Sequence, residues 1–236
     1  MNRGFSLMEL LIALSLSLGV LTMVVSSVSH TVRVSRRFGE DQQRLEAIFL
    51  AIDTLRADIE NCGMRLQEPF ALGFPIVTCA EDNTQCSLLT GRDDAFVIVP
   101  AATGASMVRV TPLTGVAAKD SVLIFEPFSR LCVANRLTQV AVAGEETHLS
   151  LADPLLQPIP AAATLVALRR VEYRWFAGER VLKRKADRGT FQPLLEGVTD
   201  FFFAYFPEDH TVLYRIEVDR REQLRGFLFL SNVRGT

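Results

Sequence analysis

The chain opens with a long apolar stretch. After the polar residues Met1-Asn2-Arg3-Gly4, residues 5–28 are mostly Leu, Val, Met and Ala, and Glu9 is their only charged residue. As a helix this segment would measure about 36 Å, which exceeds the ~30 Å hydrocarbon core of a membrane. The pattern therefore predicts a membrane-spanning helix over residues 5–28. A carboxylate inside it is costly, so Glu9 is expected to have a charged partner.

The apolar pattern continues beyond residue 28 with helical spacing. One face carries the apolar residues Leu45, Ile48, Phe49, Ile52, Leu55 and Ile59, while charged residues occupy the other faces. No proline occurs before Pro69. We therefore expect one helix from about Phe5 to about Asn61, in which residues 29–62 form an amphipathic continuation that ends near Cys62-Gly63.

After Pro69 the pattern changes to short β-rich runs separated by Pro, Gly and Asp. These runs cover residues 95–99, 107–110, 121–125, 139–142, 166–175, 179–184, 212–218 and 224–230. A hairpin is expected around Ala177-Gly178. Because no strand–helix–strand alternation is visible, the sheet is expected to be mostly antiparallel. The predicted fold class is α+β: a long N-terminal helix, half of it transmembrane, packed on a β-sheet domain over residues 63–236.

Composition and the absence of known motifs disfavour several classes of function. The chain has 236 residues and a net charge of −2, so no global field favours nucleic acid or an anionic membrane. Gly-x-Ser-x-Gly, His-Glu-x-x-His and glycine-rich nucleotide-binding motifs do not occur in the sequence. We therefore expect neither an enzyme nor a metal or cofactor site.

The four cysteines, Cys62, Cys79, Cys86 and Cys132, show no Cys-x-x-Cys spacing and no nearby histidine, which disfavours zinc. An even number favours two disulfides in an oxidising compartment, and three connectivities are open. The short polar loop between Cys79 and Cys86 favours a local pair, which would contribute ~2–3 kcal/mol. That choice leaves Cys62 to pair with Cys132.

Basic residues gather between Arg169 and Arg188. The candidate basic surface consists of Arg180, Lys183, Arg184 and Lys185. Such a surface would suit DNA phosphates or an acidic neighbouring subunit. A solvated hairpin edge, on which charges discourage association between sheets, is the commoner explanation of such a cluster.

The segment Gly4-Phe5-Ser6-Leu7-Met8-Glu9, followed by an apolar run, resembles the processing site of type IV prepilins and pseudopilins. The resemblance implies that residues 1–4 are a leader, that prepilin peptidase cuts after Gly4, and that Phe5 becomes N-methylated. It also implies that Glu9 acts in assembly by pairing with the freed α-amine of a neighbouring subunit. A buried carboxylate and an ammonium group make a strong charge-assisted pair.

The C-terminal half adds a second resemblance. Residues 171–174, 181–184, 192–198, 201–203 and 229–234 are similar to PilW-type minor pilins and to the related pseudopilin J of type II secretion. The pilus branch is favoured because the tryptophan-rich ending associated with pseudopilin J is absent, and Trp175 is the only tryptophan.

These resemblances imply partners and a location. The expected partners are other minor pilins, the major pilin, prepilin peptidase and inner-membrane lipid. The chain would be a single-pass inner-membrane protein with a periplasmic C-terminal domain, later incorporated in a filament at the cell surface.

Two alternatives stay open: a J-type pseudopilin and a membrane-tethered periplasmic binding module. One observation favours a cytoplasmic C-terminal domain instead. Arg33, Arg36 and Arg37 follow the span, whereas only Arg3 precedes it, and basic residues are more frequent on the cytoplasmic side. The leader and the cysteines favour an extracytoplasmic domain.

Overall fold

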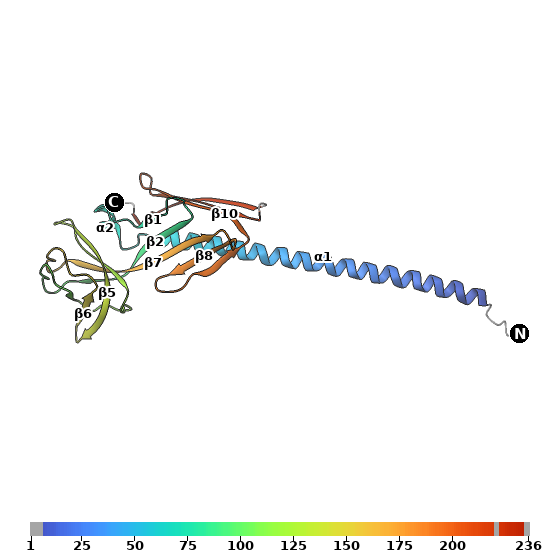
Figure 1. The fold of residues 1–236 in the computed structure, drawn as a ribbon, viewed down its shortest axis with the longest axis horizontal. Helices are drawn as coiled ribbons and strands as arrows, with labels where there is room; N and C mark the ends of the chain where they lie inside the picture. The colour runs from blue at the N-terminus through green and yellow to red at the C-terminus, as the bar shows by residue number, and fades with distance from the viewer. Residues whose placement is uncertain (1–6, 220–221, 234–236) are drawn as a thin grey trace. The chain divides into compact units, whose positions relative to one another are not determined.

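The computed structural model describes residues 7–219 and 222–233. The chain divides into two compact units, residues 1–50 and residues 51–236. In the first unit the described part is entirely helical, because α1 runs unbroken from Leu7 to Asn61 (Figure 1). The prediction of one continuous helix from about residue 5 to about residue 61 is thus confirmed from Leu7 onwards. The last turns of α1, residues 51–61, belong to the second unit.

A glycine ends α1 at the predicted place. Gly63 has a φ of 76°, a left-handed conformation that glycine adopts without a steric penalty. Its amide donates a hydrogen bond to the carbonyl oxygen of Leu89 at 2.9 Å. The chain is thereby turned away from the helix and bonded to the sheet of the second unit.

The second unit is rich in strands. Its elements after α1 are α2 (Gln67–Ala71), β1 (Val77–Cys79), β2 (Gln85–Phe96), β3 (Met107–Val110), β4 (Ser121–Glu126), β5 (Leu131–Ala143), β6 (Glu146–Leu151), β7 (Thr164–Phe176), β8 (Val181–Ala186), β9 (Gln192–Glu196), β10 (Val198–Phe206), β11 (Thr211–Val218), β12 (Glu222–Phe229) and η1 (Ser231–Val233). The expected hairpin around Ala177-Gly178 is confirmed as β7–β8, with Phe176 opposite Val181.

The larger sheet has nine strands in the described part of the chain. Its order is β1-β2-β7-β4-β5-β6-β3, and β8 and β9 continue from β7. All of its strand pairs are antiparallel, as expected. One edge of β7 pairs with β2, whereas the opposite edge is shared by β4 and β8. The fold class, α+β with a long N-terminal helix and antiparallel sheets, is confirmed.

The smaller sheet, β10-β11-β12, is also antiparallel. Along β11 the buried residues Val212, Tyr214, Ile216 and Val218 alternate with half-buried ones, which confirms the half-buried strand expected there. Gly226 of β12 lies opposite Tyr214. A Cβ on Gly226 would lie 2.4 Å from the Tyr214 ring, so the close approach of the two strands requires glycine.

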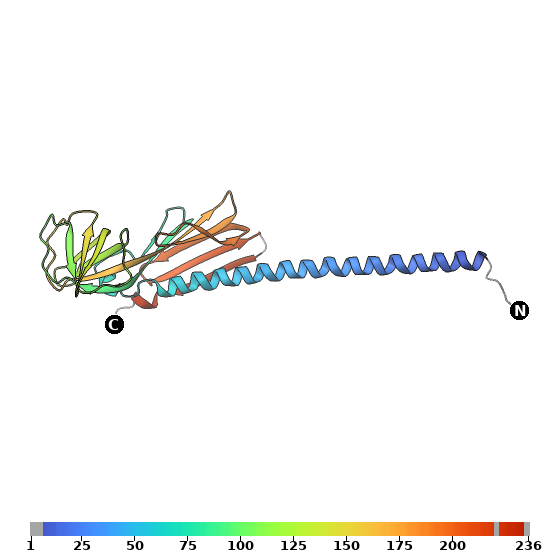
Figure 2. The same cartoon turned by 90° about the horizontal axis from the view of Figure 1, so that it is seen from below.

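Two groups of buried side chains hold the second unit together. Leu55 and Ile59, on one face of the end of α1, and Cys62, directly after it, are fully buried. A cluster around β4, β6 and β7 contains Val122, Ile124, Leu149, Ile159 and Leu165. Each buried aliphatic side chain contributes about 1.5–3 kcal/mol relative to an exposed one. At the end of the described chain, η1 contacts α2. Figure 2 shows this red segment beside the end of α1, where the Asn232 side-chain amide donates to the Glu60 carbonyl oxygen at 2.5 Å.

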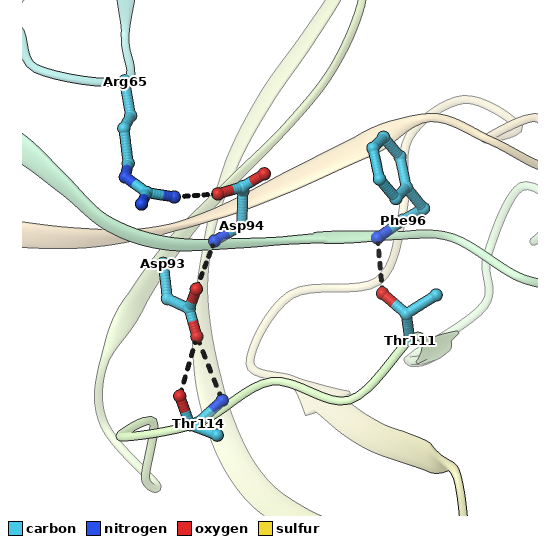
Figure 3. A network of polar contacts seen from close by, with 6 residues as sticks. All are labelled: Arg65, Asp93, Asp94, Phe96, Thr111 and Thr114. Atoms are coloured by element: carbon cyan, nitrogen blue, oxygen red, sulfur yellow. Dashed lines mark hydrogen bonds and ion pairs between the residues drawn. The ribbon is translucent and has the colours of Figure 1, made fainter.

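Polar side chains stabilise an irregularity in β2. The register with β7 shifts between Gly91 and Asp93. The Asp93 carboxylate accepts hydrogen bonds from the Asp94 amide at 3.0 Å and from the amide and hydroxyl of Thr114 at 3.1 and 3.0 Å (Figure 3). Arg65 forms an ion pair with Asp94 beside it. Side chains thus supply partners where the regular ladder is interrupted, as at a β-bulge.

Candidate functional site

The residues predicted to matter for assembly lie at the N-terminus. Gly4 and Phe5 fall outside the described residues, and Glu9 lies within α1. Among the described residues, α1 is the one helix long and apolar enough to cross a membrane. Its apolar side chains, such as Leu14, Leu18 and Leu21, are more than half exposed. An uncovered apolar surface of this length requires lipid or other helices around it, so α1 is a candidate single-pass anchor.

Hydroxyl groups within this apolar segment are satisfied locally. The Ser17 hydroxyl donates to the Ala13 carbonyl oxygen at 2.7 Å, and the Thr22 hydroxyl donates to that of Gly19 at 2.8 Å. Such bonds to the preceding turn remove the need for water or for a partner helix at these positions.

A partly buried polar cluster joins the end of α1 to the larger sheet. Asp58 lies on α1, and Tyr173 of β7 lies opposite Arg184 of β8. The Tyr173 hydroxyl donates to Asp58 Oδ2 at 2.5 Å, and Arg184 donates through Nε to Oδ2 at 2.7 Å and through Nη2 to Oδ1 at 3.0 Å. The Asp58 carboxylate is therefore held by two strands at once.

The electrostatics of this cluster keep Tyr173 and Arg184 protonated. Burial, together with the charge of Asp58, raises the pKa of Tyr173 well above its ordinary value. The hydrogen bond to Asp58 raises the pKa of Arg184. Tyr173 thus stays a neutral donor and Arg184 a cation. The cluster fixes the position of residues 51–61 against the sheet.

The cysteines are free thiols in the structure. Cys79 and Cys86 lie directly opposite each other on β1 and β2. The neighbouring pair is hydrogen-bonded, from the Ala80 amide to the Gln85 carbonyl oxygen at 2.9 Å. Because such pairs alternate along an antiparallel ladder, Cys79 and Cys86 form a non-hydrogen-bonded pair, with Cα atoms ~4.5 Å apart. That separation is compatible with a disulfide, and the predicted local pair stays a prediction.

The predicted Cys62–Cys132 disulfide is contradicted by the strand order. Cys62 Sγ lies 3.5 Å from the carbonyl oxygen of Ile76, next to β1 and β2. Cys132 lies on β5, which β7 and β4 separate from β2. Three strand spacings amount to ~14 Å, whereas a disulfide requires Cα atoms within ~7 Å. Burial raises the pKa of Cys62 to about 12, so this thiol is protonated and unreactive.

The four residues of the candidate basic surface are paired with carboxylates and do not share one face. Each of its four residues has a carboxylate partner: the ion pairs are Arg180–Asp219 at 2.8 Å, Lys183–Glu179 at 2.6 Å, Arg184–Asp58 at 2.7 Å and Lys185–Glu172 at 3.4 Å. Alternation along β8 also puts Arg184 on the opposite face from Lys183 and Lys185. The structure does not bring the four together as one unpaired surface for DNA phosphates.

The sequence contained an overlooked signal for the partly buried cluster. Asp58 falls at helical spacing between Leu55 and Cys62, on the face of α1 that is buried in the second unit. A charged residue within an apolar stripe indicates a buried partner. Within the described ranges, no group of three or more His, Cys, Asp or Glu side chains is arranged to hold a metal ion.

Comparisons with family models and with curated proteins return no match. Among solved structures, the chain is similar to the phage phi92 endosialidase, with 8% sequence identity and a TM-score of 0.24. The match covers 57% of this chain and 29% of the endosialidase chain. A likeness this weak carries no argument about fold or activity.

Proposed function

We propose that this protein is a structural subunit of the type IV pilin class, of the PilW-type minor pilin kind. It is cleaved after Gly4 by prepilin peptidase and joins a priming or tip complex of the filament. The observation that carries the proposal is the motif Gly4-Phe5-Ser6-Leu7-Met8-Glu9 directly before an apolar helix. Supporting it, that helix continues without a break into an antiparallel β domain.

The physical role of the apolar segment follows from its exposed surface. Its side chains would contact lipid while the subunit is stored in the inner membrane. On assembly, the same side chains would contact the helices of neighbouring subunits, which are equally apolar. Glu9 favours the assembled state, because the α-amine of a neighbour neutralises a carboxylate that is costly in lipid.

The test is the presence of the protein in filaments sheared from cells, measured by immunoblot. The wild-type protein is expected in the filament fraction of cells with active prepilin peptidase. Glu9→Ala is expected to insert in the membrane but to be lost from the filaments. Glu40→Ala, on the same helix beyond the apolar segment, serves as the matched control. Filaments that contain Glu9→Ala at wild-type levels would contradict the assembly role.

The J-type pseudopilin alternative predicts a different phenotype. Deletion of the gene would block protein secretion and leave surface pili intact, whereas the minor-pilin proposal predicts fewer pili and normal secretion. A membrane-tethered binding module predicts no effect on either process. Pilus counts and secreted enzyme activity in the same deletion strain distinguish the three.

A further inference from the structure

A cleft lies where the larger sheet divides. Residues 164–168 of β7 pair with β4, and residues 171–176 pair with β8, on the same edge of the strand. Near Arg170 neither strand covers that edge, and Figure 1 shows β5 and β8 towards different ends of β7. The cleft at this division has a volume of about 750 Å³. That volume lies within the range of ligand pockets, ~300–1,000 Å³.

The backbone of β7 is not available for strand addition here. The Arg170 amide donates to Asp187 Oδ1 at 2.9 Å, and the Asp187 amide donates to the Arg170 carbonyl oxygen at 2.7 Å. Recognition in the cleft therefore depends on its side chains. Five of them are basic, and three are carboxylates: Lys119, Arg136, Arg170, Lys185 and Arg188 against Asp120, Glu172 and Asp187.

Two of the carboxylates form ion pairs with cations of the cleft. Asp120 has a side chain only 5% exposed and lies 2.6 Å from Arg188 Nη2. Its other oxygen accepts a hydrogen bond from the Ala117 amide at 2.9 Å. Glu172 lies 3.4 Å from Lys185 and 3.8 Å from Arg170. These carboxylates neutralise part of the positive charge that lines the cleft.

The cleft keeps an excess of positive charge. Five basic residues against three acidic ones leave a net charge of +2. Arg136 donates through Nε to the Lys119 carbonyl oxygen at 3.3 Å, which holds the two residues together. Within residues 7–219 and 222–233, neither makes an ion pair with a carboxylate. The terminal guanidinium nitrogens of Arg136 and the Lys119 ammonium thus remain for an anion.

We infer that this cleft binds an acidic peptide segment of a protein partner, whose carboxylates pair with Lys119 and Arg136. Arginine pairs with a carboxylate through two parallel hydrogen bonds, and the cleft is larger than a single ion requires. A nucleic acid fits less well, because no aromatic side chain lines the cleft for base stacking. The inference goes beyond filament assembly and does not depend on it.

The test uses the full-length protein in detergent micelles and a fluorescein-labelled hexaglutamate peptide, with binding followed by fluorescence anisotropy. Lys119→Gln and Arg136→Gln are each expected to raise the Kd roughly tenfold, since each removes one charge-assisted contact. Arg130→Gln is the matched control, because Arg130 lies at the other end of the β4–β5 hairpin and the substitution removes the same charge. It is expected to leave the Kd unchanged.

Several results would overturn the inference. One is the absence of hexaglutamate binding at low salt, where charge pairing is least screened. Another is an equal rise in the Kd for Arg130→Gln, which would show that binding depends only on the overall charge of the protein. A third is tighter binding of a hexathymidine oligonucleotide that is lost in Arg136→Gln, which would assign the cleft to nucleic acid. None of these results bears on cleavage after Gly4, so they are separable from a failure of the proposed function.

Discussion

Arg184 donates hydrogen bonds to both carboxylate oxygens of Asp58, at 2.7 and 3.0 Å, and so ties β8 to the end of α1. In a filament subunit of the proposed kind, force applied to the helix would reach the β domain through such contacts. The ion pair is partly buried, with side chains 24% and 13% exposed. It therefore contributes more than a surface pair would.

Removing one partner of this pair should destabilise the second unit. Arg184→Gln leaves the partly buried Asp58 without its cation, and we expect a loss of about 2–4 kcal/mol in the free energy of unfolding. Guanidinium unfolding of the full chain, followed by the fluorescence of Trp175, measures this loss. Glu60→Gln, at an exposed position on the same helix, is expected to change the free energy by less than about 0.5 kcal/mol. A loss as small for Arg184→Gln would contradict the role of the ion pair.

The strand register predicts which of the four cysteines are oxidised. In an oxidising compartment Cys79 and Cys86 should form a disulfide that contributes ~2–3 kcal/mol. Cys62 and Cys132 should stay reduced, because the sheet keeps them apart. Non-reducing peptide mapping after alkylation of the unfolded protein tests both statements. A peptide that links Cys62 to Cys132 would show that the strand order is incorrect.

Asp93 should make stability depend on pH in the acid range. Burial opposes its ionisation, but the hydrogen bonds from Thr114 and the Asp94 amide lower its pKa below the ordinary value. The contribution is therefore present above the pKa of the unfolded chain, ~3.9, and is lost as the pH falls through the lower folded value. Asp93→Asn should cost about 1–2 kcal/mol at pH 7 and progressively less below pH ~4. Urea unfolding at pH 7, 4 and 3 measures this, and a difference as large at pH 3 as at pH 7 would count against it.

Gly91 should tolerate no side chain. A Cβ there would lie 2.8 Å from both Arg65 Cβ and Val166 Cγ1, so Gly91→Ala is expected to cost about 1–3 kcal/mol through overpacking. Gly178→Ala is the control, because the space around that glycine is open to 4 Å. Thermal unfolding of both variants measures the difference. Equal melting temperatures would show that β2 can shift to make room.

The sequence predicts the parts of this fold in which a single pattern dominates. The apolar periodicity without proline is sufficient for α1, and the turn at Ala177-Gly178 is sufficient for the β7–β8 hairpin. The strand β6 was missed because Thr147, a polar residue, occupies a core position and is 1% exposed. Its hydroxyl accepts a hydrogen bond from the Leu113 amide at 3.3 Å, a partner that sequence periodicity does not reveal.

Prediction of the sites requires knowledge of which strands are neighbours in the sheet. Cys62 and Cys132 were paired by elimination along the chain, whereas their separation depends on the positions of β7 and β4 in the sheet. The cleft near Arg170 is likewise formed by β4 and β8, which are distant in sequence and share one edge of β7. Local patterns carry no information on such a division of a sheet.

The N-terminus of the mature protein tests the central claim most directly. Mass spectrometry of protein purified from its own cells, with active prepilin peptidase, should show a chain that begins at N-methylated Phe5. Gly4→Val should retain residues 1–4, because a side chain at this position would hinder the close approach of the backbone to the peptidase. A wild-type chain that retains Met1 in such cells would contradict the pilin-class assignment.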